Sequence, residues 1–270
     1  MAAAYTTILT PVDFSINTDT AIFKALEVAN CEGARIYLLH VLPVSHVIND
    51  ALLNERKIAL QKLKQRVEKF SYIRAEAMIT FSDSVQDAIA TKAGEIRADL
   101  VVIGKKSSHW LPFLNTVAPD QLAETAGKPV LTVKPGAAQA QMKTIVVPVS
   151  NTVPYEKMNA IAALCHNLKL KVHLVTFVNG TNNPDDVSAS SLLHVFQWLK
   201  NLMVCQIEYA VLKGNNRIRS VLNYAEEIDA DLLLLYPGAE IRTGWLKRPL
   251  PDVLPASSKL QVLAVEPQSA

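Results

Sequence analysis

The chain has 270 residues and a formal net charge of +2; half of its residues are hydrophobic and 19% are charged. This composition is ordinary for a globular protein, and the length suits one large domain or two of about 135 residues. The basic residues are scattered, which argues against a nucleic-acid or membrane partner, and Cys31, Cys165 and Cys205 lack the spacing of a zinc site. The N-terminus has no signal-peptide pattern and no apolar run could cross a bilayer, so we expect a cytoplasmic protein with reduced thiols.

The first part of the chain alternates short apolar segments with amphipathic ones. The patterns predict strands over 7–12, 36–41 and 75–79, and helices over about 17–31, 50–70 and 85–96. Ser84 and Asp87 have the spacing of a capping box at the start of the last of these helices. Because strands and helices alternate, we expect a parallel sheet with right-handed crossovers.

The stretch from Asp99 to Val133 continues this alternation. It predicts strands over 100–103 and 130–133 and, between them, a turn at Gly104 and a helix over about 117–126. Asn115 and Thr116 have the chemistry of an N-cap for that helix. A glycine turn that leads to a helix N-terminus can bind an anion, because unpaired amides and the helix dipole point the same way.

The pattern then restarts after a small, polar segment. Residues 144–149 repeat 7–12 almost residue for residue, and three further matches follow in order: 171–177 with 35–41, 230–232 with 98–100, and 262–265 with 130–133. Ordered matches of this kind predict an internal duplication. We expect one domain over 1–136, a linker over 137–141 and a second domain over 142–270. Two separate sheets are expected, so one continuous sheet through ten strands would argue against this organisation.

Four segments at the strand ends carry a family resemblance. They are Pro11-Val12-Asp13-Phe14-Ser15, His40-Val41, Ala98 to Gly104, and Lys128-Pro129-Val130-Leu131. In this order they resemble the universal stress protein family in its tandem two-domain form. The resemblance implies two doubly wound, five-stranded parallel α/β sheets of the adenine nucleotide α-hydrolase-like type. It also implies pairing of the two domains and a cytoplasmic role in stress adaptation. Many members of the family bind ATP and others do not.

The loop after the fourth strand decides what the resemblance implies for ATP. In ATP-binding members this loop has a glycine, two residues, a second glycine, nine residues, and a third glycine followed by Ser or Thr. Gly104 fits the first position, but Ser107 stands at the second and adds a Cβ to the phosphate cradle. Asn115-Thr116 stands at the third glycine and the hydroxyl, after seven intervening residues rather than nine.

The resemblance therefore implies a degenerate nucleotide site in the first domain. In it, Asp13 would contact the nucleoside, the Val41 backbone would contact the base, and Lys105 would offset phosphate charge. Each residue also has a purely structural interpretation: Asp13 and Asn115-Thr116 as helix caps, and Lys105 as a solvated loop residue. In the second domain Ser150 replaces the aspartate and Tyr236 replaces the first glycine, so no site of the family type is expected there. The full candidate set is Pro11, Asp13, Val41, Gly104, Lys105, Asn115, Thr116 and Val117.

No catalytic or metal motif accompanies this set. GxSxG, HExxH and Walker patterns do not occur. We expect a non-catalytic stress-response protein whose domains form an intramolecular pseudo-dimer. It would bind a small ligand or an unidentified protein and would bind ATP weakly or not at all. The first alternative is a regulator that binds ATP in the first domain, with or without slow hydrolysis. The second is an adenine-nucleotide transferase or ligase. A homodimer of the whole chain stays open.

Overall fold

The computed structural model describes residues 4–29, 31–46, 50–105, 117–150, 153–177, 187–201, 206–214, 216–237, 242–243 and 248–266. The strands of the first half are β1 (Thr7–Pro11), β2 (Arg35–Leu42), β3 (Arg74–Phe81), β4 (Leu100–Gly104) and β5 (Val130–Val133). Those of the second half are β6 (Thr144–Pro148), β7 (Lys171–Phe177), β8 (Gln206–Leu212), β9 (Leu232–Leu235) and β12 (Gln261–Ala264). A small hairpin pairs β10 (Arg242–Thr243) with β11 (Arg248–Pro249).

Helices connect the strands in both halves. The first half contains α1 (Ile16–Val28), α2 (Asp50–Phe70), α3 (Val85–Glu95) and α5 (Pro119–Ala126), with 3-10 turns η1 (Val44–His46) and η2 (Pro135–Ala137). The second contains α6 (Tyr155–Asn167), α7 (Val187–Asn201), α8 (Arg217–Glu227) and the short α9 (Leu250–Val253). The predicted α/β alternation is confirmed. The side chain of Ser84 accepts a hydrogen bond from the Asp87 amide, as the capping pattern predicts.

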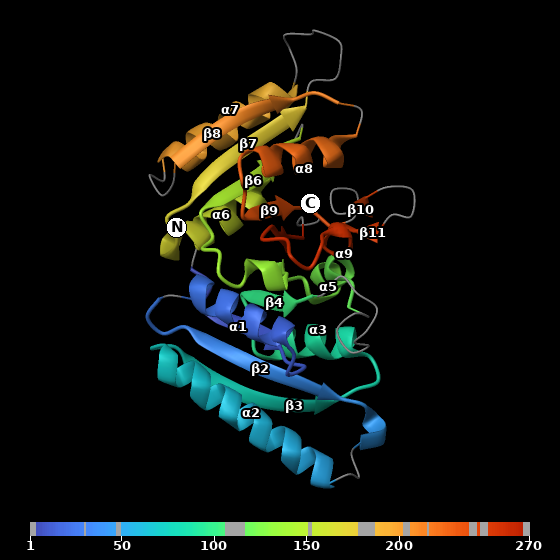
Figure 1. Ribbon diagram of the computed structural model, residues 1–270. Coiled ribbons are helices and arrows are strands. Elements are labelled where there is room, and N and C mark those ends of the chain that lie inside the picture. Colours follow the sequence, from blue (N-terminus) through green and yellow to red (C-terminus); the bar gives the residue numbers. More distant parts are fainter. Residues whose placement is uncertain are drawn as a thin grey trace.

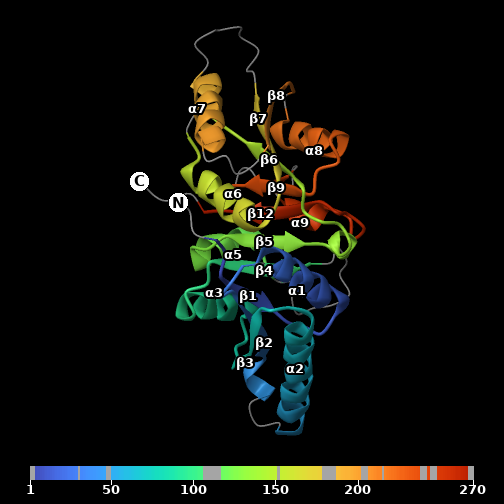
Figure 2. The ribbon, with the colours of Figure 1, turned by 90° about the vertical axis from the view of Figure 1, so that its left-hand side faces the viewer.

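All the main strands belong to one sheet. Its ten strands have the order β3-β2-β1-β4-β5-β12-β9-β6-β7-β8 (Figure 1 and Figure 2). Each half is five-stranded and parallel, as predicted, and the two halves meet where β5 pairs with β12 in the antiparallel direction. The expectation of two separate sheets is therefore wrong. It failed because the free edge of β5 can pair with the equivalent edge of the other half.

The register of this seam preserves the duplication rather than contradicting it. Leu131 pairs with Leu263 at the centre of the seam, and these leucines occupy equivalent positions in the repeats 130–133 and 262–265. A local twofold axis thus passes through this pair, as in the self-complementary contact of a symmetric dimer.

Two aspartates at equivalent positions of the two halves also indicate a duplicated fold. Asp99 Oδ2 accepts hydrogen bonds from the Thr6 and Thr7 amides at 3.0 and 2.9 Å. Asp231 Oδ2 accepts from the Lys143 and Thr144 amides at 2.9 and 3.0 Å. Each carboxylate holds the start of the first strand of its own half, which is what a duplicated fold requires.

The helices form two layers around the sheet. Helices α1, α2, α6 and α7 contribute to one buried cluster, which includes Ile22, Leu60, Met158 and Val195. Helices α3, α5 and α8 contribute to the other, which includes Ile89, Leu122 and Val221. Figure 2 shows α1 and α2 on the opposite side of the first-half strands from α3 and α5. The sheet is thus covered on both faces, as parallel sheets usually are.

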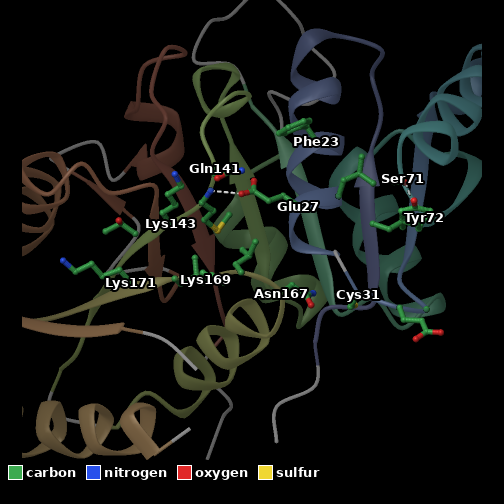
Figure 3. A pocket seen from close by; sticks show the side chains of 18 of the residues that line it. Phe23, Glu27, Cys31, Ser71, Tyr72, Gln141, Lys143, Asn167, Lys169 and Lys171 are labelled. Carbon is green, nitrogen blue, oxygen red and sulfur yellow. Dashed lines mark hydrogen bonds between the residues drawn. The ribbon is translucent and has the colours of Figure 1, made fainter. Parts of the chain in front are cut away.

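A broad groove lies where the two halves meet on the α1 and α6 side (Figure 3). It has a volume of about 1970 Å³ and lies beside the starts of β2, β3, β6 and β7. An inter-half hydrogen bond from the Asn167 side chain to the Val28 carbonyl, 2.8 Å long, joins the ends of α6 and α1 next to it.

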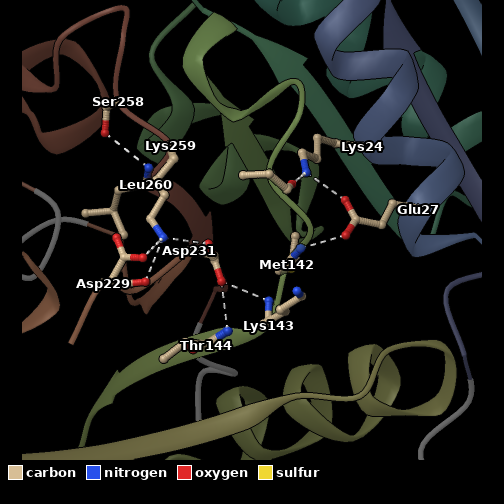
Figure 4. A network of polar contacts seen from close by, with 11 residues as sticks. Lys24, Glu27, Met142, Lys143, Thr144, Asp229, Asp231, Ser258, Lys259 and Leu260 are labelled. Carbon is tan, nitrogen blue, oxygen red and sulfur yellow. Dashed lines mark hydrogen bonds and ion pairs between the residues drawn. The ribbon is translucent and has the colours of Figure 1, made fainter.

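The predicted linker is fixed to both halves. Lys24 is fully buried; its ammonium group forms an ion pair with Glu27 at 2.7 Å and donates a hydrogen bond to the Ala140 carbonyl (Figure 4). Glu27 also accepts a 2.7 Å hydrogen bond from the Met142 amide. The Gly136 amide donates to the Ala256 carbonyl at 2.9 Å. The limits of 137–141 remain a prediction, but this segment is held by specific contacts on either side.

Candidate functional site

The structure brings part of the predicted nucleotide site together. Pro11 ends β1 and Gly104 ends β4, while Val41 lies one residue before the end of the neighbouring β2. The carboxyl ends of β1 and β4 flank the point where the strand order reverses, which is where ligands bind in open α/β sheets. Asn115 and Thr116 lie outside the described residues.

The Asp13 carboxylate is used by the turn that begins α1. Its Oδ1 atom accepts hydrogen bonds from the Ser15 amide at 3.0 Å, the Ser15 hydroxyl at 2.6 Å and the Thr18 hydroxyl at 2.6 Å. Ser15 is the N-cap of α1, and Phe14 before it has a left-handed φ of 60°. Ser15 is therefore the helix cap, and the interpretation of Asp13 as the cap itself is wrong: Asp13 stabilises the turn before α1 by holding Ser15 and Thr18. Within the described part of the chain, Oδ2 of Asp13 has no hydrogen-bond partner.

Gly104 is required by the packing of α1. A Cβ at this position would lie 2.0 Å from the Asn17 carbonyl oxygen and 2.5 Å from its carbon. No side chain fits there unless the helix moves. The glycine therefore has a structural cause that involves no phosphate.

Lys105 is buried, with 4% of its surface exposed. Its ammonium group donates a 2.8 Å hydrogen bond to the Val117 carbonyl, and its amide donates to the Val133 carbonyl at 2.9 Å. The prediction of a solvated loop lysine is thus wrong. Its chemistry gave no sign of this, because a lysine after a glycine turn is normally solvent-exposed.

The helix after the loop begins later than predicted. It starts at Pro119 with Ala118 as N-cap, so the predicted cap by Asn115-Thr116 is wrong. The N-cap has no side-chain hydrogen bond of its own; instead, the Ala118 amide donates to Gln86 Oε1 of α3 at 3.1 Å. Sequence reasoning missed the role of Gln86 and the contact between Thr18 and Asp13. Thr18 could have been found as a hydroxyl in the first turn after the aspartate, whereas Gln86 gave no signal.

His40, near the end of β2, packs beside the turn that contains Asp13 and Phe14. Its Nδ1 donates a 2.7 Å hydrogen bond to the Val12 carbonyl, and its ring centroid lies 4.8 Å from that of Phe14. Burial lowers the pKa of His40 below its ordinary value. His40 is therefore a packed residue near the strand end, held by the Val12 carbonyl and the Phe14 ring.

The matching end of the second half contains larger side chains. Tyr236 follows β9 where Gly104 ends β4, and its hydroxyl donates a 2.9 Å hydrogen bond to Glu156. The Lys157 ammonium lies 4.3 Å from the centre of the Tyr236 ring and donates to the Pro148 carbonyl at 2.9 Å. The Tyr236 side chain thus lies at this strand end. The Lys157 ammonium beside it is already stabilised by the Tyr236 ring and the Pro148 carbonyl.

A family model described as the universal stress protein family matches residues 4–134. The first half of the chain belongs to the universal stress protein family. This confirms the resemblance carried by the strand-end segments, and the duplicated fold of the whole chain is compatible with the tandem form. No curated protein sequence matches the chain.

Solved structures show the same fold over almost the whole chain. A universal stress protein from Archaeoglobus fulgidus DSM 4304 is 13% identical with a TM-score of 0.73, covering 98% of this chain and 99% of that one. A functionally unknown protein from Pseudomonas aeruginosa PAO1 is 17% identical with a TM-score of 0.59, covering 98% and 93%. A universal stress protein in complex with cAMP covers 48% of this chain and 98% of its own, with 22% identity and a TM-score of 0.41, a likeness too partial to indicate what this chain binds.

Two further findings concern the described residues alone. Among the residues that the structure describes, no helix is long and apolar enough to cross a membrane. No cluster of histidine, cysteine, aspartate and glutamate side chains in the same residues could hold a metal ion.

Proposed function

We propose that this universal stress protein acts by binding, without catalysis, and that its affinity for ATP is weak or absent. Membership of the family supports a role in stress response. The observation that carries the proposal is that both charged groups of the predicted site already serve the fold. Asp13 Oδ1 holds Ser15 and Thr18 in the turn that leads into α1, and the Lys105 ammonium donates to the Val117 carbonyl.

Affinity arithmetic supports weak binding. Low-micromolar ATP binding needs about 7–8 kcal/mol, most of it from groups that meet the nucleoside and the phosphates. Lys105 would have to give up a buried hydrogen bond to contact a phosphate, and a buried carbonyl left without a donor costs about 1–3 kcal/mol. The serine at position 107 adds a Cβ where ATP-binding relatives have a glycine.

One observation favours the alternative of an ATP-binding regulator. Oδ2 of Asp13 has no hydrogen-bond partner among the described residues, and it belongs to a half-buried side chain at the strand ends where ligands bind. A ribose hydroxyl could donate to this atom without disturbing the turn.

Isothermal titration with ATP separates the two. The proposal predicts no saturation up to about 1 mM ATP, which corresponds to less than about 4.1 kcal/mol. A low-micromolar Kd that weakens at least about tenfold in Asp13→Ala would favour the regulator. Ser150→Ala, at the equivalent position of the second half, is the matched control and should leave the titration unchanged. Phosphate release from ATP above that of a buffer blank would contradict the absence of catalysis.

A further inference from the structure

We propose that the groove between the two halves binds an extended acidic peptide segment that also carries apolar side chains. The groove is separate from the strand ends discussed above, since it lies beside the starts of β2, β3, β6 and β7. Its volume of about 1970 Å³ exceeds the range of roughly 300–1,000 Å³ that is usual for small-ligand pockets. A length of polypeptide suits this space better than a single small molecule.

One wall of the groove is basic. Lys143, Lys169 and Lys171 project from the starts of β6 and β7 (Figure 3). Lys143 and Lys169 are exposed, and among the described residues their ammonium groups have no ion-pair partner. Lys171 is paired at 2.7 Å with Glu208, which lies outside the groove lining.

The opposite wall is mainly aromatic and apolar, although exposed Lys69 at the end of α2 also lines it. Phe23 of α1 is 54% exposed, and Tyr72 in the turn before β3 is fully exposed. Leu26 and Ile73 line the groove beside them. Exposed aromatic side chains that gather in a groove are typical of a binding surface, since they bury apolar area when a partner docks.

The acidic residues of the groove do not cancel the lysines. Glu27 is neutralised by the buried Lys24 and bound to the Met142 amide, as Figure 4 shows, which leaves Glu32 as the exposed carboxylate of the lining. These contacts also fix the floor, because they hold Met142 in place. The groove thus has a cationic side and a mainly apolar side, and a partner with alternating acidic and apolar residues complements both.

A peptide is favoured over a nucleic acid. Nucleic-acid sites carry a dense array of cations that neutralise many phosphates, whereas this lining has three lysines along one wall and Lys69 near the Glu32 carboxylate on the other. The net charge of the whole chain is only +2. Acidic residues that alternate with apolar ones match the two walls better than a uniformly charged backbone does.

The test is fluorescence anisotropy with a set of short labelled peptides in which Asp or Glu alternates with Leu or Phe. We expect a Kd of about 10–100 µM for at least one peptide, and binding that weakens as salt is raised. The pair Lys143→Glu/Lys169→Glu should weaken binding at least about tenfold. The pair Phe23→Ala/Tyr72→Ala should weaken it about fivefold with an unchanged salt dependence.

A matched control makes the result specific. Lys57→Glu/Lys62→Glu reverses the same number of exposed charges on α2, outside the groove lining, and should change the Kd by less than about twofold. The proposal is overturned if no peptide of the set binds below about 1 mM, or if the control pair weakens binding as much as the groove pair. It is also overturned if a single-stranded oligothymidylate displaces the peptides and if the groove variants no longer bind that oligonucleotide. The assay contains no nucleotide other than this competitor, so its outcome is independent of the ATP titration.

Discussion

The backbone of α1 occupies the space that a side chain at position 104 would need. Gly104 is a residue that family resemblance assigns to a phosphate contact and that packing explains without one. Asp13 and Lys105 also serve the fold, because Asp13 holds the turn before α1 and Lys105 donates to a carbonyl beyond the loop. At the scale of single residues, the first-half site is thus built from groups that the fold itself needs.

We predict that Gly104→Ala destabilises the protein by about 2 kcal/mol or more, because the new Cβ would overlap the Asn17 backbone. Urea unfolding followed by circular dichroism measures the change. Gly94→Ala is the matched control: it lies in α3 with no atom within 4 Å of the added Cβ, so it should be neutral or stabilising by up to about 1 kcal/mol. Equal effects of the two substitutions would contradict the packing account.

The neutral ring of His40 gives the fold a pH dependence. Burial lowers its pKa, and Arg56 and Asp13 are the charged groups that act on it. The unfolded chain therefore binds the proton more readily. The stability that the neutral ring provides is complete above the unfolded pKa of about 6.5 and is lost as the pH falls through that value toward the folded pKa.

We predict that the free energy of unfolding falls between pH 6.5 and 5, and that His40→Gln makes this fall shallower by up to about 1.4 kcal/mol per pH unit. Urea midpoints measured across this range test it. His166→Gln alters an exposed histidine and serves as the control. A His40→Gln slope equal to that of the parent protein would rule out the buried ring as the cause.

At the scale of elements, the segment between the halves is a structural part rather than a tether. The Lys24–Glu27 pair and the Gly136 amide hold it to α1 and to the residues before β12. The small, polar residues of this segment favour its interpretation as a linker. They give no sign that Lys24 of α1 donates a hydrogen bond to the Ala140 carbonyl within it. The pair is informative because removing one member leaves the other charged and buried.

We predict that Glu27→Ala costs about 3–5 kcal/mol of stability, since it leaves the fully buried Lys24 ammonium without its carboxylate. The double variant Lys24→Met/Glu27→Leu should recover part of this loss, because no buried charge remains. Glu32→Ala, in the exposed turn after α1, should stay within about 0.5 kcal/mol of the parent. Unfolding curves for the variants provide the values, and a loss of less than 1 kcal/mol in Glu27→Ala would contradict this role.

Local rules predicted most elements and failed where distant residues act. Sequence patterns predict the alternation of strands and helices, the Ser84 cap and the repeat, because each of these depends on neighbouring residues in the sequence. The start of α5 was misplaced because Gln86, more than thirty residues earlier, takes the place of a local cap. Likewise, the burial of Lys105 depends on a carbonyl beyond the loop, and the single sheet depends on pairing between the last strands of the two halves, which are far apart in the sequence.

At the scale of the whole molecule, the antiparallel seam makes one structural unit of two copies. Leu131 and Leu263 are each 1% exposed at its centre, and each half contributes strands to the same two buried clusters. The self-complementary seam uses up the β5 edge that would otherwise be open to aggregation or pairing with another chain.

We predict that the chain unfolds in one cooperative transition and that Leu131→Ala lowers its free energy of unfolding by about 2–5 kcal/mol while leaving a single transition. Circular dichroism and tryptophan fluorescence recorded on the same urea series should coincide. A two-step curve in which only one step responds to Leu131→Ala would show that the halves unfold independently.

The first half has the α/β fold of its family, and its Asp13 and Lys105 side chains serve its own structure. A crystal structure of the protein grown with millimolar ATP and magnesium tests this most directly. We expect no ordered triphosphate at the strand ends of either half, with Asp13 still bonded to Ser15 and Thr18 and Lys105 still bonded to the Val117 carbonyl. A triphosphate seated against Gly104 and Lys105, with that lysine turned to meet it, would contradict the account.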